Sequence, residues 1–207
     1  MRTEEEEGSG GSLFGAESAY AQSILCSALG DGEGCVEALR DSLEALPTYA
    51  PAILSLGSVE YQLDRRPEGR HLFLSLLCLP EGTEELTEII DKAGDFLISA
   101  SQYADGLELY RGATERFPDT AVFHQGVSCC AGHLQLYDEA LAAAEAALAL
   151  EPHNQEVVND LGWSLHQAGR LEDAKAALEQ AVAMDPADRL AAGNLSLCSS
   201  VLATRAA

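Results

Sequence analysis

The stretch LGWSLHQAGRLEDA, residues 161–174, decides the fold. Apolar residues recur at helical spacing on both sides of AGR, residues 168–170, and that segment interrupts the pattern. Gly162 lies inside the first helical run, where a glycine costs roughly 1 kcal/mol relative to alanine. Such a cost is expected where a helix must pack closely against a neighbour that occupies the space of the missing side chain.

The same pattern occurs 34 residues earlier, in VSCCAGHLQLYDEA, residues 127–140. The small Ser128 corresponds to Gly162, and an acidic pair or its equivalent precedes an alanine in both stretches. Three prolines follow the same period of 34 residues: Pro118, Pro152 and Pro186. A fixed period of this length indicates a repeat architecture.

Each unit is predicted to be a helical hairpin. In residues 155–188 a first apolar stripe contains Val158, Leu161 and Leu165. Gly169 follows, where a left-handed conformation suits the turn. A second stripe, at spacings of three and four, contains Leu171, Ala174, Leu178, Ala181 and Val182. Pro186 ends the unit. Gly162 would then let the two helices approach and would accept a side chain from the second helix.

The segment EVVNDLGWSLHQAGRLEDAKAALEQAVAMDPAD, residues 156–188, resembles a tetratricopeptide repeat, with its Leu-Gly pair, its small alanines and its terminal proline. The resemblance extends to residues 121–154 and 87–120. It implies an all-α fold, a right-handed α-solenoid of about five helical hairpins with a C-terminal capping helix.

The expected organisation is a single domain over residues 13–207. Its repeats are expected near 16–49, 50–86, 87–120, 121–154 and 155–188, with the capping helix at about 189–203. Within this scheme, the first helix of the first unit is expected at about 17–29 and the second helix of the second unit at 67–79. EGTEE after Pro80 is interpreted as a longer connection. Residues 1–12, MRTEEEEGSGGS, are expected to form a disordered acidic and glycine-rich tail, either native or part of an expression product.

The charge is strongly acidic, because 12 Lys and Arg stand against 34 Asp and Glu, a formal net charge of −22. Such a surface repels nucleic acid and anionic membrane, and it permits basic protein partners. The alternative is that the charge serves only solubility. Residues 1–12 do not have the pattern of a secretory signal, and no apolar run is long enough for a membrane span. A cytoplasmic protein with reduced, mostly buried cysteines is expected.

The sequence contains no strong signal for a catalytic, cofactor or metal site. GDGEG, residues 30–34, lacks a preceding strand and carries two acids, so we interpret it as a turn and not a phosphate loop. Cys129 and Cys130 are adjacent, which suits packing better than metal binding or redox chemistry. The repeat spacing allows His133 and His166 to approach each other across neighbouring repeats, but two imidazoles without a third ligand are weak evidence for a metal. No cofactor is expected.

The resemblance implies that first helices line a concave groove that holds a segment of another protein. In that register the groove would contain Glu88, Asp91, Asp95, Ser99, Gln125, Cys129, His133, Asn159, Trp163 and His166. Ordinary solvated surface is the alternative for these residues. Trp163, expected to be exposed, favours binding, because tryptophan is a common interface anchor.

The leading hypothesis is a non-enzymatic adaptor or scaffold that binds a protein or peptide with basic and apolar residues. Some members of the family grip C-terminal carboxylates with basic groove residues, but only Lys92 is available here, among acids, which argues against that mode. A chaperone or assembly factor that shields an apolar client segment, as secretion chaperones of the family do, is the nearest alternative. An enzyme or metal-binding protein is the third class. The oligomeric state is left open.

Overall fold

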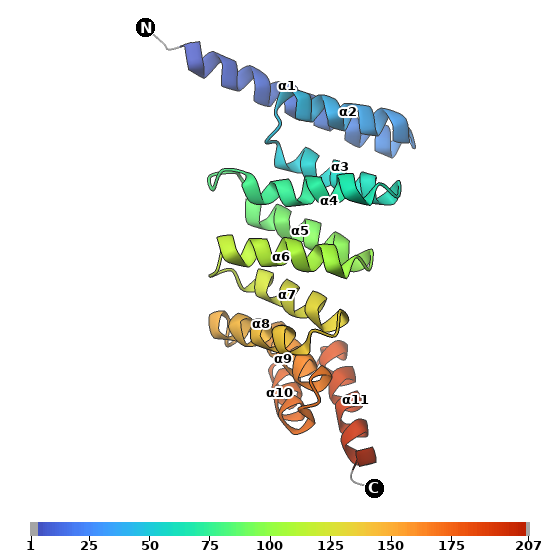
Figure 1. Ribbon diagram of the computed structural model, residues 1–207, viewed down its shortest axis with the longest axis vertical. Coiled ribbons are helices and arrows are strands. Elements are labelled where there is room, and N and C mark those ends of the chain that lie inside the picture. Colours follow the sequence, from blue (N-terminus) through green and yellow to red (C-terminus); the bar gives the residue numbers. More distant parts are fainter. Residues whose placement is uncertain (1–3, 206–207) are drawn as a thin grey trace. The chain divides into compact units, whose positions relative to one another are not determined.

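The computed structural model describes the backbone of residues 4–205 and the side chains of residues 13–205. Within that range the chain forms eleven α-helices and no strand (Figure 1). The first unit of the chain contains α1 (Glu4–Ala28), α2 (Gly32–Ala45), α3 (Ala50–Gln62), α4 (Arg66–Ser75) and the short 3-10 helix η1 (Leu76–Cys78). Then follow α5 (Leu86–Ser99), α6 (Tyr103–Arg116), α7 (Ala121–His133), α8 (Tyr137–Leu150), α9 (Gln155–Gln167), α10 (Leu171–Met184) and α11 (Arg189–Arg205). The predicted all-α helical repeat fold is confirmed.

The chain divides into two compact units, Met1–Phe96 and Leu97–Ala207, and the boundary falls inside α5. In the first unit α1 packs against α2, α2 against α3, and α3 against α4. In the second unit each of the helices from α6 to α11 packs against the next. Packing on sequence neighbours is the pattern of helical repeats. The single domain over 13–207 and its right-handed superhelix remain predictions.

The N-terminal segment differs from the expected disordered tail over residues 1–12. Helix α1 begins at Glu4, so residues 4–12 are helical, while residues 1–3 lie outside the described residues. Four consecutive glutamates, Glu4–Glu7, have good helix propensity, and this outweighs the glycines that follow them. Composition had suggested a tail because glycine and like charges also characterise flexible segments.

One residue in the turn that joins the two helices of each hairpin adopts a left-handed conformation, and these residues recur at nearly constant spacing. They are Gly30, Asp64, Ser101, Gln135 and Gly169, with φ between 57° and 78°. The residue after each donates its backbone N–H across the turn, as when Arg170 N bonds to the carbonyl of Leu165 at 2.9 Å. This is the Schellman arrangement that satisfies the last carbonyls of a helix. The left-handed Gly169 was predicted, whereas the Asp, Ser and Gln were not.

Gly162 has the packing role that the sequence predicts. A Cβ added at this position would lie 2.6 Å from Cγ of Leu178 on α10 and 3.2 Å from the backbone nitrogen of Leu178. The Leu178 side chain is fully buried in a cluster with Leu165, Leu171 and Cys198. Gly57 on α3 receives the ring of Phe73 on α4 in the same way.

The cores of the two units are built from different residue types. In the first unit Tyr61, Phe73 and Phe96 form an aromatic cluster, with ring centroids 5.5 to 5.8 Å apart. In the second unit, α8 buries four alanines: Ala140, Ala143, Ala144 and Ala147. Small residues let helices approach closely, so this part of the fold depends on backbone proximity more than on large side chains. Among the described residues no helix combines the length and apolar character needed to cross a membrane.

Candidate partner-binding surface

A row of hydrogen bonds joins the first helices α7, α9 and α11 of the second unit. The Ser128 and Ser164 hydroxyls lie 2.9 Å apart in a buried position between α7 and α9. Gln125 Nε2 donates to the Asp160 carboxylate at 2.9 Å, also between α7 and α9. Asn194 Nδ2 on α11 donates to Oδ1 of Asn159 at 3.0 Å. These bonds fix the three helices side by side.

Next to this row, three side chains occupy equivalent positions at a spacing of 34 residues: Cys129, Trp163 and Leu197. Cys129 and Trp163 each follow a serine of the Ser128–Ser164 pair by one residue, so they lie on the same side of α7 and α9. Cys129 is exposed, Trp163 is half-buried and Leu197 is 47% exposed. We call the surface formed by these three residues and the polar row beside them the α7–α9–α11 face.

Trp163 is not the fully exposed anchor that the sequence predicts. Its indole stacks on the imidazole of His166, with ring centroids 5.0 Å apart and planes 13° apart. Both ring nitrogens of His166 are buried and have no hydrogen-bond partner among the described residues. Buried polar atoms usually have a partner. The Trp163–His166 pair therefore combines a half-buried aromatic surface with two buried polar atoms that the described residues leave without a partner.

The other predicted residues of α7 and α9 lie in different surroundings. His133 is exposed and stacks on Tyr103 of α6, with centroids 4.0 Å apart. Gln125 is half-buried and Asn159 is buried, and both take part in the polar row. The polar groups of these two residues already form hydrogen bonds within the chain, so the two residues stabilise the surface and are less available to a partner.

The predicted residues of α5 are divided between the two units, since Glu88, Asp91 and Asp95 lie in the first and Ser99 in the second. Glu88, Asp95 and Ser99 are exposed and Asp91 is half-buried. Glu88 pairs with Lys92 at 2.7 Å, one turn along the helix. Within the second unit, the predicted residues of α7 and α9 lie on two helices that contact each other.

Asp160 is a functional candidate that sequence reasoning missed. Burial raises the pKa of its carboxyl, while the hydrogen bonds from Gln125 and Asn159 act in the opposite direction. A cation brought close to such a carboxyl group stabilises its charged form. The 35-residue spacing between Gln125 and Asp160 is the only signal in the sequence that links the two.

The cysteines are all thiols, but fewer are buried than expected. Only Cys130 and Cys198 are buried, whereas Cys78 and Cys129 are exposed. Burial raises the pKa of the Cys130 thiol to about 12, so this thiol is protonated and unreactive at neutral pH. Cys130 packs where Gly106 lacks a side chain, which agrees with the packing interpretation. In residues 13–205 no three His, Cys, Asp or Glu side chains gather as metal ligands would.

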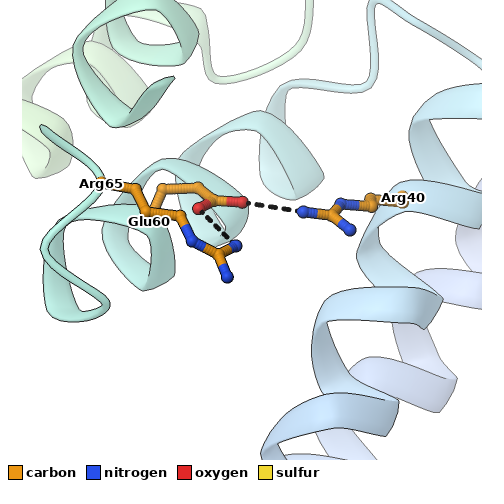
Figure 2. Close-up of polar contacts among 3 residues, drawn as sticks. All are labelled: Arg40, Glu60 and Arg65. Atoms are coloured by element: carbon orange, nitrogen blue, oxygen red, sulfur yellow. Dashed lines mark hydrogen bonds and ion pairs between the residues drawn. The ribbon is translucent and has the colours of Figure 1, made fainter. Parts of the chain in front are cut away.

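A second polar cluster lies in the first unit, beside a pocket of about 970 Å³ between α2 and the end of α3. Glu60, buried on α3, accepts from Arg40 Nη2 at 3.2 Å through one oxygen and from Arg65 Nη1 at 3.2 Å through the other. Figure 2 shows the carboxylate between the two guanidinium groups. Because both oxygens are satisfied within the chain, this cluster ties α2 to the α3–α4 turn.

Comparison with known proteins agrees with this architecture. Residues 135–197 match the family model described as tetratricopeptide repeat. The small glutamine-rich tetratricopeptide repeat-containing protein 2 of Mycosarcoma maydis is 27% identical over 118 residues, which are 55% of this chain and 34% of that protein. The chain therefore matches about a third of the length of this curated relative.

Two solved structures illustrate the likeness of fold. YrrB, described as a TPR protein with an unusual peptide-binding site, has a TM-score of 0.57 and 20% identity, over 83% of this chain and 87% of that chain. The first TPR of Spaghetti (RPAP3), bound to the HSP90 peptide SRMEEVD, has a TM-score of 0.52 and 19% identity, over 56% of this chain and 92% of that chain. At these identities the likeness concerns the fold alone.

Proposed function

Because the chain belongs to the tetratricopeptide repeat family, we propose that it is a non-enzymatic adaptor or scaffold that binds a segment of another protein on the α7–α9–α11 face. The observation that carries the proposal is the Trp163–His166 stack beside a fixed row of hydrogen bonds. A rigid surface with an aromatic anchor loses little conformational freedom on binding. Two solved proteins of this fold are described with a peptide or a peptide-binding site, which supports the same kind of role.

The chemistry of the face favours a partner with an apolar residue and a basic residue close together. Trp163 and Leu197 offer apolar area, and an apolar anchor from the partner would cover them. Glu156 is exposed on α9, and Asp160 lies half-buried one turn further along the same helix. A lysine or arginine of the partner would pair with these carboxylates, and the attraction would raise the rate of association more than the final affinity.

The same face does not favour capture of a C-terminal carboxylate. Neither α7 nor α9 contains a lysine or an arginine. The partner therefore differs in charge from the acidic peptide SRMEEVD seen on the Spaghetti domain.

The test is affinity capture from a cell extract with the full chain, followed by mass spectrometry. The comparison is between the natural chain, Trp163→Ala, and the control Met184→Ala, which truncates an exposed side chain at the end of α10. A partner captured by the natural chain and the control but lost with Trp163→Ala supports the proposal. Equal capture by the natural chain and both variants would mean that the partner does not bind at Trp163.

A chaperone role is the second candidate, favoured by the apolar positions Cys129, Trp163 and Leu197 along one face. The two roles differ in what happens to the partner alone. A client that aggregates unless this chain is present in stoichiometric amounts indicates a chaperone. A partner that stays soluble on its own indicates an adaptor.

A further inference from the structure

Helix α1 carries an exposed apolar surface that its packing does not explain. The exposed fractions are 43% for Leu13, 73% for Phe14, 57% for Ile24, 62% for Leu25 and 81% for Leu29 just after the helix. Soluble chains seldom leave so many large apolar side chains together in water unless something binds there. These five residues form what we call the α1 outer face.

Helical geometry places these residues on one side of α1. Leu13 and Ile24 are eleven residues apart, as are Phe14 and Leu25, and eleven residues make about three turns. The opposite side of α1 is occupied, because Ala16 is fully buried and its carbonyl accepts from the Ser42 hydroxyl of α2 at 2.8 Å. The α1 outer face is thus the side that α2 leaves uncovered.

Beside this face lies an acidic pocket of about 620 Å³ between α1 and α2. Phe14 and Cys26 contribute to its wall from α1, and three carboxylates contribute from the α2 side: Asp31, Glu37 and Asp41. Residues 13–45 contain six acidic residues and one arginine, a net charge of −5, and that Arg40 is engaged with Glu60. An apolar surface next to uncompensated acids attracts a ligand that is apolar on one side and basic on the other.

We propose that the α1 outer face binds a basic amphipathic helix from another protein. Its apolar residues, at spacings of three and four, would cover Phe14, Ile24 and Leu25, and its lysines or arginines would lie over the acidic pocket. A second copy of this chain suits the face poorly, because each copy carries a net charge of −22 and would repel the other. The surface belongs to the first unit and does not depend on the role proposed for the second.

The experiment uses the full chain and a fluorescent synthetic peptide of leucine and lysine with leucines at spacings of three and four. A scrambled peptide of the same composition measures the attraction that comes from charge alone. Fluorescence anisotropy compares the natural chain with Phe14→Ser combined with Leu25→Ser, with Glu37→Gln combined with Asp41→Asn, and with the control Leu136→Ser combined with Leu190→Ser. The control removes two exposed leucines of the second unit.

The amphipathic peptide should bind more tightly than the scrambled one, and the Phe14 and Leu25 change should weaken binding at least about tenfold. The acidic-pocket change should weaken it at low salt and much less at high salt, because exposed charges are screened. The control should bind as the natural chain does. Hydrogen exchange on the natural chain adds a readout without mutation, since the peptide should protect amides of residues 13–29.

Three results would overturn the proposal. The first is equal binding of both peptides, which would mean that bulk charge alone attracts them. The second is protection of amides outside residues 13–29 with none inside. The third is a natural chain that sediments as a dimer and becomes monomeric with the Phe14 and Leu25 change, because a second copy would then cover the face.

Discussion

The half-buried Asp160 carboxylate on α9 accepts a hydrogen bond of 2.9 Å from Gln125 on α7. The net effect of burial is a raised pKa, although Gln125 and Asn159 favour the charged form. The folded chain therefore holds a proton on this carboxyl at pH values where the unfolded chain has lost it. This relationship makes the stability of the second unit dependent on pH.

Asp160→Asn should remove that dependence. Because the folded pKa is above the unfolded one, the natural chain loses stability as pH rises from the ordinary aspartate range through the raised pKa. The asparagine keeps an oxygen for Gln125 and carries no charge. The free energy of unfolding of the variant should therefore exceed that of the natural chain at neutral pH, and the gap should close as pH falls toward 4. Urea unfolding at several pH values measures it, and a gap that widens in acid would contradict the assignment.

Gly162→Ala should destabilise the second unit by about 1–3 kcal/mol, because the added methyl group meets Leu178 and its backbone. Gly193→Ala on α11 is the matched control, since nothing lies within 4 Å of the added Cβ. In a helix that control should be neutral or stabilising by roughly 0.4–1 kcal/mol. Thermal unfolding followed by circular dichroism compares the two, and similar effects at both positions would show that close packing is not the reason for Gly162.

The packing of Gly162 against Leu178 illustrates why this fold could be predicted from the sequence. A 34-residue period, a glycine inside a helical pattern and a proline at the end of each unit are local features, and each has one physical reason. The Gln125–Asp160 bond was missed because it depends on which residues of two neighbouring helices face each other. Trp163 was predicted to be exposed because the sequence does not show that His166 stacks on it.

The turns show the same limit. Gly169 was predicted to be left-handed because glycine adopts that conformation easily, whereas Ser101 and Gln135 carry no such signal. Only their spacing of one repeat from Gly169 and from each other indicates that Ser101 and Gln135 occupy the left-handed position of the turn. The α1 outer face was also unpredicted, because apolar residues at helical spacing look alike whether a neighbour covers them or not.

Gln135→Gly should stabilise the second unit by about 0.5–1 kcal/mol. A left-handed glutamine is strained by roughly 1–2 kcal/mol, and the extra freedom of glycine in the unfolded chain offsets part of the gain. Gly169→Ala tests the converse at the next turn and should destabilise, although open space surrounds it. The denaturant midpoints of both variants are compared with that of the natural chain. Gln135→Gly should raise the midpoint and Gly169→Ala should lower it. A lower midpoint for both variants would contradict the explanation.

Glu60→Gln should destabilise the first unit by about 1–2 kcal/mol. The buried carboxylate loses its charge between Arg40 and Arg65, but both guanidinium groups are half-exposed, which limits the loss. Glu139→Gln is the control, because Glu139 pairs with Arg111 in a more exposed site at 2.6 Å, and about 1 kcal/mol or less is expected there. Hydrogen exchange of α2 and α3 measures the first effect. Unchanged exchange in these helices would mean that the cluster does not hold them.

The last prediction concerns the two groups of residues that the sequence assigns to one binding surface. Trp163→Ala should weaken binding of a captured partner at every salt concentration, by at least about 2 kcal/mol if Trp163 is a main anchor. Asp91→Asn combined with Asp95→Asn should weaken it mainly at low salt, because screening already reduces long-range attraction at physiological ionic strength.

Combining both changes then shows whether the acids of α5 and the α7–α9–α11 face contact the same partner. Losses that add in free energy indicate independent contributions, and losses that do not add indicate coupling through the partner. Trp163 is the only tryptophan of the chain, so its emission reports directly on the face and should shift on binding. Normal binding by Trp163→Ala, together with an unchanged emission in the natural chain, would show that the partner does not contact this face.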